Sequence, residues 1–255
     1  MVTRDTAWLP GTPCWVDVSV DSVEKAVTFY GSLFGWEAGI NPDPQFGGYA
    51  IFTKDGNRVA GAAPVQDPGQ PHVWTTTVAS DDVEQTAAKI KAAGGQVMQD
   101  PMDVADLGRM IVASDPAGAV FCAWQSGTHT GFGLANEPGA VSWNENMSRD
   151  WDGNKKFYNE VFGYEYGDMS SDEFSYATLD LQGRPVGGIG TLPPGTPDEM
   201  PANWLTYFGV SDTDASLAKA VELGGSVVKE AFDTPNGRIA ILADDQGAVF
   251  GIVSV

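Results

Sequence analysis

The sequence predicts an α+β fold in which four βαβββ modules pair into two domains. The octet FYGSLFGW at 29–36 returns as FYNEVFGY at 157–164, and GRMIVASDPAGAVF at 108–121 returns as GRIAILADDQGAVF at 237–250. Each half divides again, because strand patterns of period two precede amphipathic helix patterns at four places. A repeat that extends along the whole chain indicates duplicated structural units, and it therefore sets the fold class.

The first quarter begins with PCWVDVSV at 13–20, which nearly alternates and predicts a strand. A helix follows, with Val23, Ala26, Val27 and Tyr30 on one face. The stretch YAIFTKDGNRVAGAAPV at 49–65 predicts a hairpin, because Asp-Gly at its centre is typical of a type I′ turn. Each octet is expected to end the first helix of its domain and to lead into the second strand.

The second quarter repeats this plan. A β-branched strand is expected at 72–79 and a helix at 81–95, with acidic residues at its start, lysines near its end and glycines after it. Two further strands are expected at about 107–114 and 119–124. The stretch PVQDPGQP at 64–71 links the two quarters.

In the second half we expect strands at 141–147, 174–180, 186–191, 204–210, 238–243 and 248–254, and helices at 152–161 and 213–223. The stretch 192–201 corresponds to the earlier linker. The predicted organisation is therefore a first domain at 1–126, a linker at 127–139 and a second domain at 140–255.

Composition restricts the partners. With 34 acidic and 14 basic residues, the net charge of −20 disfavours nucleic acid and anionic membranes. We find neither a signal peptide nor an apolar run of the roughly 20 residues that span a bilayer. The two cysteines, Cys14 and Cys122, are too few for a disulfide framework. We therefore expect a cytoplasmic protein, a monomer or a homodimer, whose partner is a small organic molecule.

The repeated phrases resemble the vicinal oxygen chelate superfamily, which contains glyoxalase I, bleomycin-resistance proteins and extradiol dioxygenases. The resemblance rests on AVTFYGSLFGW, KKFYNEVFGY, KAAGG, VELGG, and SDPAGAVF with ADDQGAVF, in the correct order along nearly the whole chain. It implies two glyoxalase-like domains, each a U-shaped mixed sheet with helices outside and a cleft that holds the ligand.

Catalytic members of that family bind a divalent metal through His or Gln, and Glu, on the first and last strands. Matching the landmarks places these positions at Trp15, Thr75 and Cys122 in the first domain and at Trp143, Leu205 and Gly251 in the second. Indole and leucine side chains cannot bind a hard cation. Of the two histidines, His129 lies in the linker and His72 is out of phase with the ligand position. We therefore predict no metal and no other cofactor.

Aromatic and acidic side chains replace the metal ligands. Trp15 and Trp143 fall at the expected cleft positions, and Trp74 and Trp204 lie one residue away from them, so all four are candidates for ligand binding or for core packing. Asp17 and Glu145 follow the first pair by two residues and share their strand face. A buried carboxylate there could act as an acid, a base or an anchor for a cation, whereas a solvated strand end is the alternative.

Three further residues are candidates for ligand binding. Arg109 and Arg238 start matched strands and could hold an anionic group or form surface ion pairs. Cys122 could be a thiol nucleophile or a small core residue.

Two functions follow from these features. One is metal-independent binding of a small aromatic or amphipathic metabolite in Trp-lined clefts, which could give resistance by sequestration, as in bleomycin-resistance proteins. The other is an enzyme, a lyase, isomerase, hydrolase or hydroxylase, with Asp17 or Glu145 as the acid-base group. The two domains differ too little in sequence to show which cleft is functional.

Overall fold

The computed structural model describes residues 2–67, 69–172 and 174–255, and within these it contains the four modules that the repeat predicts. Module 1 comprises β2 (Pro13–Val20), α1 (Val23–Phe34), β3 (Glu37–Ile40), β4 (Ala50–Lys54) and β5 (Asn57–Pro64), with a 3-10 turn at Pro44–Phe46. Module 2 comprises β6 (Val73–Ala79), α2 (Val83–Ala92), β7 (Gln96–Val104), β8 (Gly108–Ser114) and β9 (Val120–Ser126). Pro68, in the predicted linker 64–71, lies outside the described residues.

The second half repeats the same element order. Module 3 comprises β11 (Val141–Ser148), α3 (Trp151–Phe162), β12 (Glu165–Asp168), β13 (Tyr176–Leu181) and β14 (Arg184–Thr191). Module 4 comprises β15 (Asn203–Val210), α4 (Thr213–Glu222), β16 (Ser226–Thr234), β17 (Gly237–Ala243) and β18 (Val249–Ser254). Two short strands, β1 (Val2–Thr3) and β10 (Leu134–Ala135), pair with each other before the second half begins.

Each helix begins and ends where local chemistry favours it. Ser22, Asp82, Asp150 and Asp212 cap the four helices by accepting a hydrogen bond from the backbone N–H three residues later. The repeated octets do end α1 and α3, because Gly35 and Gly163 adopt left-handed conformations that close the helices. The sequence therefore specifies these boundaries locally.

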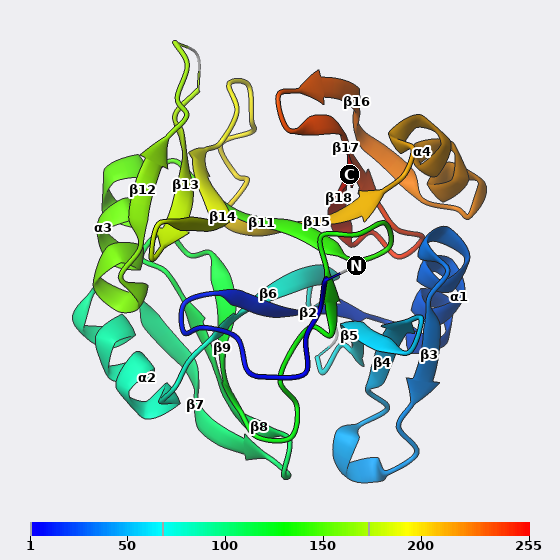
Figure 1. Cartoon of the computed structure of the whole chain (residues 1–255), viewed down its shortest axis with the longest axis horizontal. Helices are drawn as coiled ribbons and strands as arrows, with labels where there is room; N and C mark the ends of the chain where they lie inside the picture. The colour runs from blue at the N-terminus through cyan, green and yellow to red at the C-terminus, as the bar shows by residue number, and fades with distance from the viewer. Residues whose placement is uncertain (1, 68, 173) are drawn as a thin grey trace.

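The modules of each half join through their first strands. In the first half β2 runs antiparallel to β6, while β5 lies parallel to β2 and β9 lies parallel to β6. The strand order across this mixed sheet is β3, β4, β5, β2, β6, β9, β8, β7. The second half repeats it with β11 and β15 at the centre. Helices α1 and α4 cover one side of the molecule, and α2 and α3 cover the other (Figure 1). The predicted α+β class is confirmed.

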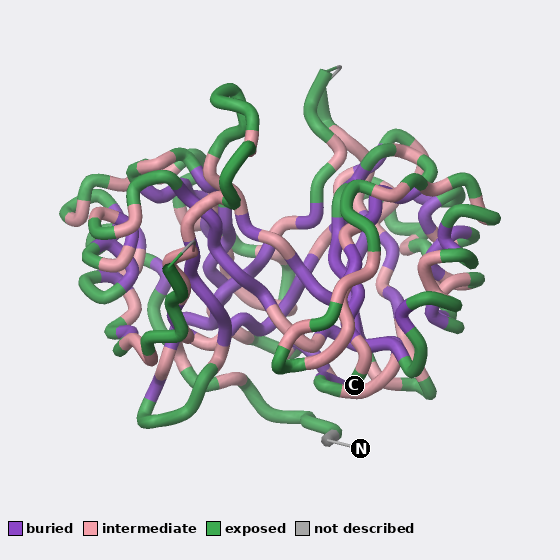
Figure 2. The backbone as a smooth tube through the Cα atoms, turned by 90° about the horizontal axis from the view of Figure 1, so that it is seen from above, coloured by how far each residue is buried: buried purple, intermediate pink, exposed green. Residues whose placement is uncertain are grey.

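The core crosses between the halves. One buried cluster joins α1 and β4 of module 1 to Phe208 and Phe250 of module 4. The other joins α2 and β9 of module 2 to α3, β13 and β14 of module 3. Buried segments accordingly run through the centre of the molecule, with exposed helices and loops outside (Figure 2). Each half therefore contributes one side of both cores.

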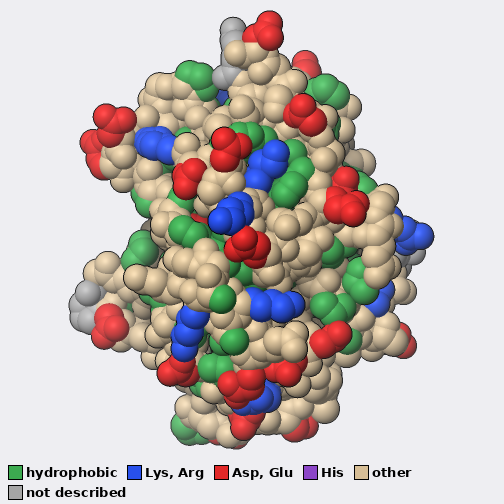
Figure 3. Space-filling view, turned by 90° about the vertical axis from the view of Figure 1, so that its left-hand side faces the viewer, with side chains coloured by type: hydrophobic (Ala, Val, Ile, Leu, Met, Phe, Trp, Pro, Cys, Tyr) green, Lys and Arg blue, Asp and Glu red, His purple; other side chains and the backbone are tan. Residues whose placement is uncertain are grey.

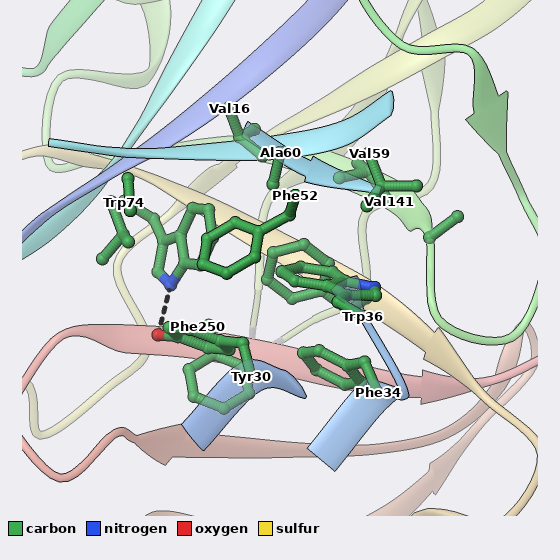
Figure 4. Packing of buried hydrophobic residues seen from close by; sticks show 14 of the residues in the cluster. Val16, Tyr30, Phe34, Trp36, Phe52, Val59, Ala60, Trp74, Val141 and Phe250 are labelled. Atoms are coloured by element: carbon green, nitrogen blue, oxygen red, sulfur yellow. Dashed lines mark hydrogen bonds between the residues drawn. The ribbon is translucent and has the colours of Figure 1, made fainter. Parts of the chain in front are cut away.

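Hydrogen bonds tie these cores together across the halves. In the first cluster, Tyr30 on α1 donates to Asp244 of module 4 at 2.8 Å, and Trp74 donates to the Tyr30 hydroxyl at 2.9 Å (Figure 4). In the second cluster, Tyr158 on α3 donates to Asp115 of module 2 at 3.0 Å. The repeated Phe-Tyr therefore joins each first helix to the opposite half.

The surface fits the acidic composition. On the face around α2 and α3, acidic side chains are spread across the view with lysines and arginines between them (Figure 3). Among the described residues, no helix is long and apolar enough to cross a membrane.

Candidate functional site

The two faces of the central strands differ in exposure. In β2, Val16, Val18 and Val20 are fully buried against the helix side, whereas Asp17 and Ser19 on the opposite side are half-buried. We name this opposite side the open face of the sheet. Solvent reaches this face in part at Asp17 and Ser19, whereas Trp15 on the same face is buried.

The open face of domain 1 gathers the first group of polar side chains around Asp17. Trp15 donates its indole N–H to Asp17 Oδ1 at 3.0 Å, and the Tyr49 hydroxyl donates to the same oxygen. Gly61 lies opposite Asp17 on β5, where a Cβ would collide with the Tyr49 hydroxyl. A glycine is therefore needed for the Tyr49–Asp17 bond to form.

A second row of residues, paired across neighbouring strands, lies next to the Tyr49–Asp17 hydrogen bond. Trp15 pairs with Thr77 on β6, Thr77 pairs with Cys122 on β9, and Cys122 pairs with Val112 on β8. Ile51 pairs with Gly61 on the other side of Asp17, and both Ile51 and Val112 are half-buried. Ile51, two strands from Asp17, and Val112, on β8 in the row of Trp15, are therefore apolar residues of the same face, whereas Thr75 is the direct partner of Asp17 on β6. We name Trp15, Asp17, Tyr49, Thr77 and Cys122 the Asp17 cluster.

Burial sets the protonation of this cluster. It raises the pKa of Asp17 to about 6, although hydrogen bonds from Tyr49 and Trp15 oppose the shift. It also raises the pKa of the Cys122 thiol to about 12, with the nearby Asp17 charge adding to the effect. The thiol is therefore held protonated near neutral pH and is a poor nucleophile, whereas the Asp17 carboxyl can exchange a proton there.

Domain 2 has a corresponding group, which we name the Glu145 cluster. The Trp143 indole N–H donates to the Tyr176 hydroxyl at 2.8 Å, and that hydroxyl donates to Glu145 Oε2 at 2.8 Å. Tyr207, which stands where domain 1 has Thr77, donates to Glu145 Oε1 at 2.7 Å. Its ring lies against Gly251, where a Cβ would come within 2.2 Å of it. The glycine therefore makes room for the second tyrosine.

The two clusters differ in whether one carboxylate oxygen is left without a hydrogen-bond partner. Both oxygens of Glu145 accept a tyrosine hydroxyl, its side chain is 9% exposed, and burial raises its pKa. In domain 1, Trp15 and Tyr49 both bind Oδ1 of Asp17, and Oδ2 has no hydrogen-bond partner among the described residues. Only the Asp17 cluster therefore offers a free carboxylate oxygen.

The side chains at the expected metal positions do not fit a divalent ion. In domain 1, the residues paired across the strands at these positions are Trp15, Thr77 and Cys122. Thr77 therefore stands at the position for which the sequence predicted Thr75. In domain 2 the corresponding residues are Trp143, Tyr207 and Gly251, and Leu205 pairs with Glu145. Within the described part of the chain, no three His, Cys, Asp or Glu residues converge on one point. The donor set is unsuited to a hard cation.

The tryptophans have three different surroundings. Trp15 is 4% exposed, so it orients Asp17 and offers a ligand little surface. Trp74 and Trp204 lie on the helix side, and their indoles donate to Tyr30 and Tyr158. The structure therefore places this second pair in the core, away from the open faces.

Trp143 is the one of these four tryptophans that borders a cavity among the described residues. It lines a cavity of about 140 Å³ between the N-terminal segment and domain 2, together with Trp8 and Phe132. A cavity of that size holds about one benzene ring.

Arg109 and Arg238 do not line either open face. Arg109 binds Glu84 on α2 at 2.9 Å and Asp103 at 2.7 Å. Arg238 binds Asp214 on α4 at 2.9 Å and Asp233 at 3.1 Å. The alternative of surface ion pairs, rather than ligand binding, describes both of them.

Sequence reasoning missed the tyrosines of both clusters. Tyr49 and Tyr176 stand just before β4 and at the start of β13, at corresponding places in modules 1 and 3. The signal that could have found them is the matched glycine, Gly61 or Gly188, which lies opposite each carboxylate. A glycine inside a strand marks a close approach by another group.

Known proteins resemble the chain over almost its full length. A family model described as Glyoxalase/Bleomycin resistance protein/Dioxygenase superfamily matches residues 14–123 and 147–252. "Putative glyoxylase CFP32" of Mycobacterium tuberculosis is 40% identical over 250 residues, covering 95% of this chain and 94% of the relative. "Anthracycline biosynthesis protein DauV" of Streptomyces sp. (strain C5) is 37% identical over 264 residues, covering 98% of this chain and 95% of the relative.

Solved structures share the fold. The Mn(II)-bound glyoxalase from Novosphingobium aromaticivorans has a TM-score of 0.67 at 17% identity, over 96% of this chain and 83% of that one. The 2,2',3-trihydroxybiphenyl 1,2-dioxygenase from Sphingomonas wittichii strain RW1 has a TM-score of 0.65 at 13% identity, over 97% of this chain and 91% of that one. At such identities the likeness shows the fold alone.

Proposed function

Since the chain belongs to the glyoxalase/bleomycin resistance protein/dioxygenase superfamily, we propose that it binds a small aromatic or amphipathic molecule on the open face of domain 1. Asp17 is the polar anchor of this site, and no metal takes part. The expected metal positions carry indole, hydroxyl and thiol groups instead of a hard-cation donor set, so the ligand must be held by organic groups.

One observation carries the choice of site. Asp17 keeps Oδ2 free, whereas tyrosines occupy both oxygens of Glu145. A carboxylate oxygen on a face that also carries half-buried apolar residues binds a hydroxyl or ammonium group of a ligand whose ring packs on that face. Domain 1 is therefore the binding domain in this proposal, and domain 2 completes the cores.

The names of the relatives suggest a ligand class. Two of them, from Streptomyces, are described as anthracycline biosynthesis proteins. An anthracycline combines a fused aromatic ring system, carbonyl and hydroxyl groups, and an amino sugar. Such a molecule offers an apolar surface for Ile51 and Val112 and a hydrogen-bond donor for Asp17. The net charge of −20 would also attract a cationic ligand.

Titration with an anthracycline tests this proposal, with quenching of tryptophan fluorescence as the readout. We expect saturable binding to the wild-type protein and about tenfold or greater weakening in Asp17→Asn, because a charge-assisted hydrogen bond is lost. Glu145→Gln is the matched control and should bind as the wild type does. Equal affinity in all three proteins would refute the assignment to domain 1.

A second function, acid–base catalysis, is favoured by the pKa of Asp17. A carboxyl group with a pKa of about 6 can take a proton from a bound hydroxyl or an acidic C–H and return it. The Tyr49 hydroxyl, bound to the other oxygen, holds the carboxylate in place. Proton transfer from the α-carbon of a ketone ligand to Oδ2 leaves an enolate, and return of that proton to the opposite face of the same carbon completes an epimerisation without a co-reactant.

Deuterium exchange separates the two functions. An aryl ketone with an exchangeable α-hydrogen is incubated with protein in D₂O and followed by NMR. Exchange that depends on Asp17 and rises through about pH 6 would support catalysis. Binding with no exchange, and recovery of the unaltered ligand, would support sequestration, as in bleomycin-resistance proteins.

A further inference from the structure

One buried histidine has a hydrogen-bond donor without a partner. His129 follows β9, is 8% exposed, and lies against two indoles of the open face of domain 1. Its ring centre is 4.5 Å from that of Trp15 and 5.6 Å from that of Trp124. Because the Trp15 indole also binds Asp17, a single side chain links His129 to the Asp17 cluster.

The neighbours of His129 determine which ring nitrogen carries the proton. Arg58 Nη1 lies 3.2 Å from His129 Nδ1, and a guanidinium can only donate. Nδ1 must therefore accept, which places the hydrogen on Nε2. Burial and the Arg58 charge lower the pKa of His129 to about 4, so the ring is neutral near pH 7.

Nε2 is buried and has no hydrogen-bond partner among the described residues. Buried donors in folded proteins are nearly always paired, so an orphaned donor calls for a specific explanation. Here the donor belongs to a ring that packs on Trp15, whose indole binds Asp17.

We propose that His129 Nε2–H donates to an acceptor oxygen of the ligand, and that this oxygen is the carbonyl of a quinone or aryl ketone. This inference rests on the proposed function, which it extends from the anchor at Asp17 to a second anchor. Asp17 Oδ2 accepts and His129 Nε2–H donates, with the Trp15 indole between them. The site therefore selects an aromatic molecule that carries both a hydroxyl or amine and a carbonyl.

Two ring systems that differ in the carbonyl groups test the proposal. The probes are 2-hydroxyanthraquinone, whose hydroxyl cannot bond to its own carbonyl, and 2-hydroxyanthracene, titrated against the wild type, His129→Phe and His129→Gln. Phenylalanine keeps a packed ring but has no donor, whereas glutamine keeps an N–H donor. We expect His129→Phe to weaken quinone binding about tenfold, with little change for the anthracene, and His129→Gln to recover part of the loss.

The outcomes distinguish a failure of this inference from a failure of the proposed function on which it rests. Equal affinity of His129→Phe and the wild type for the quinone, or equal weakening for both probes, would show that His129 only packs. Binding of neither probe by the wild type would overturn the proposed function and this inference together. Binding that Asp17→Asn weakens but His129→Phe does not would leave the function and remove the second anchor.

Nitrogen-detected NMR of the wild-type protein reports on the His129 ring directly, and a variant at the other histidine serves only to assign the signals. The chain has two histidines, so His72→Gln assigns the signals. The Nε2–H resonance of His129 should shift when 2-hydroxyanthraquinone binds and not when 2-hydroxyanthracene binds. An unchanged resonance in the saturated quinone complex would refute the proposal.

Discussion

At the scale of single residues, Asp17 and Glu145 differ because of one neighbour. Thr77 in domain 1 pairs with Cys122 and makes no hydrogen bond to Asp17 among the described residues, whereas Tyr207 in domain 2 lies over Gly251 and binds the carboxylate. A tyrosine where the other domain has a threonine, beside a glycine on the next strand, therefore occupies the second carboxylate oxygen of Glu145.

The buried Asp17 should make stability depend on pH. Burial raises its pKa from 3.8 to about 6, so the folded protein holds this proton more tightly than the unfolded chain does. The resulting stabilisation is complete below pH 3.8 and is lost as the pH rises through about 6. Asp17→Asn cannot titrate, so the wild type should lose about 1–3 kcal/mol of unfolding free energy relative to it between about pH 4 and pH 8.

Urea denaturation of both proteins across that pH range measures the effect. The difference between their unfolding free energies should follow a single titration centred between the two pKa values. Parallel curves would mean that the pKa of Asp17 is the same in the folded and unfolded states.

The sequence could predict part of this site. The spacing of two between Trp15 and Asp17 places both on one strand face, and the repeat predicts the same for Trp143 and Glu145. Tyr49 could not be found in this way, because the fold brings it to Asp17 from another strand, 32 residues along the chain. The one-residue offset of Trp74 and Trp204 put them on the opposite face, in the core.

At the scale of elements, the repeated octet has a structural role. Tyr30 and Tyr158, the second residues of their Phe-Tyr pairs, each donate to an aspartate of the opposite half. Asp244 Oδ1 also accepts two backbone N–H groups of its own turn, so this residue shapes the turn and binds the helix. The two phrases that reveal the repeat thus contact each other in the folded protein.

This contact predicts unequal effects of two matched substitutions. Tyr30→Phe removes the side-chain donor to Asp244 Oδ2 and should cost about 1–3 kcal/mol, since a buried carboxylate oxygen loses its partner. Tyr158→Phe should cost less, because Asn146 and Asn154 still donate to Asp115 Oδ2. Both variants leave one indole N–H unpaired, so that loss cancels in the comparison.

Urea unfolding of both variants beside the wild type supplies the comparison. A loss in Tyr158→Phe equal to or larger than that in Tyr30→Phe would show that the two amides do not compensate. The unfolding slope should stay unchanged, since neither variant alters the surface exposed on unfolding.

Strands β7 and β16 were not predicted from the sequence. Both are largely exposed, and β7 contains Pro101 and charged residues, so neither shows an apolar period of two. They form because β8 and β17 pair with them across irregular registers. Tertiary pairing, rather than local propensity, therefore builds the outer edge of each sheet.

At the scale of the whole molecule, the repeat and the cores divide the chain differently. The sequence divides it into halves that look like complete domains, and most strand pairing follows that division, with β18 pairing with β6 across it. The hydrophobic clusters instead join module 1 to module 4 and module 2 to module 3. His72 adds a polar link between the halves, with Nδ1 lying 2.5 Å from the carbonyl oxygen of Gln246. Sequence repeats could show the duplication but not which surfaces the copies bury.

The halves should therefore depend on each other to fold. A fragment of residues 1–139 would expose Tyr30, Phe34 and Trp74, which pack on Phe208 or Phe250 in the intact chain. A fragment of residues 140–255 would expose Tyr158 and Phe162, which pack on Phe121. Burial of aromatic side chains dominates core energetics, so neither fragment should reach a cooperative fold alone.

Expression of each fragment alone and of both together tests this dependence. Each alone should give little near-ultraviolet circular dichroism and no cooperative thermal transition, whereas refolding them together should restore both. The restored complex should also lose its transition on dilution, because its stability then depends on concentration. A sharp transition in either isolated fragment would mean that one sheet and its own two helices suffice, and that the shared cores add stability without being required for folding.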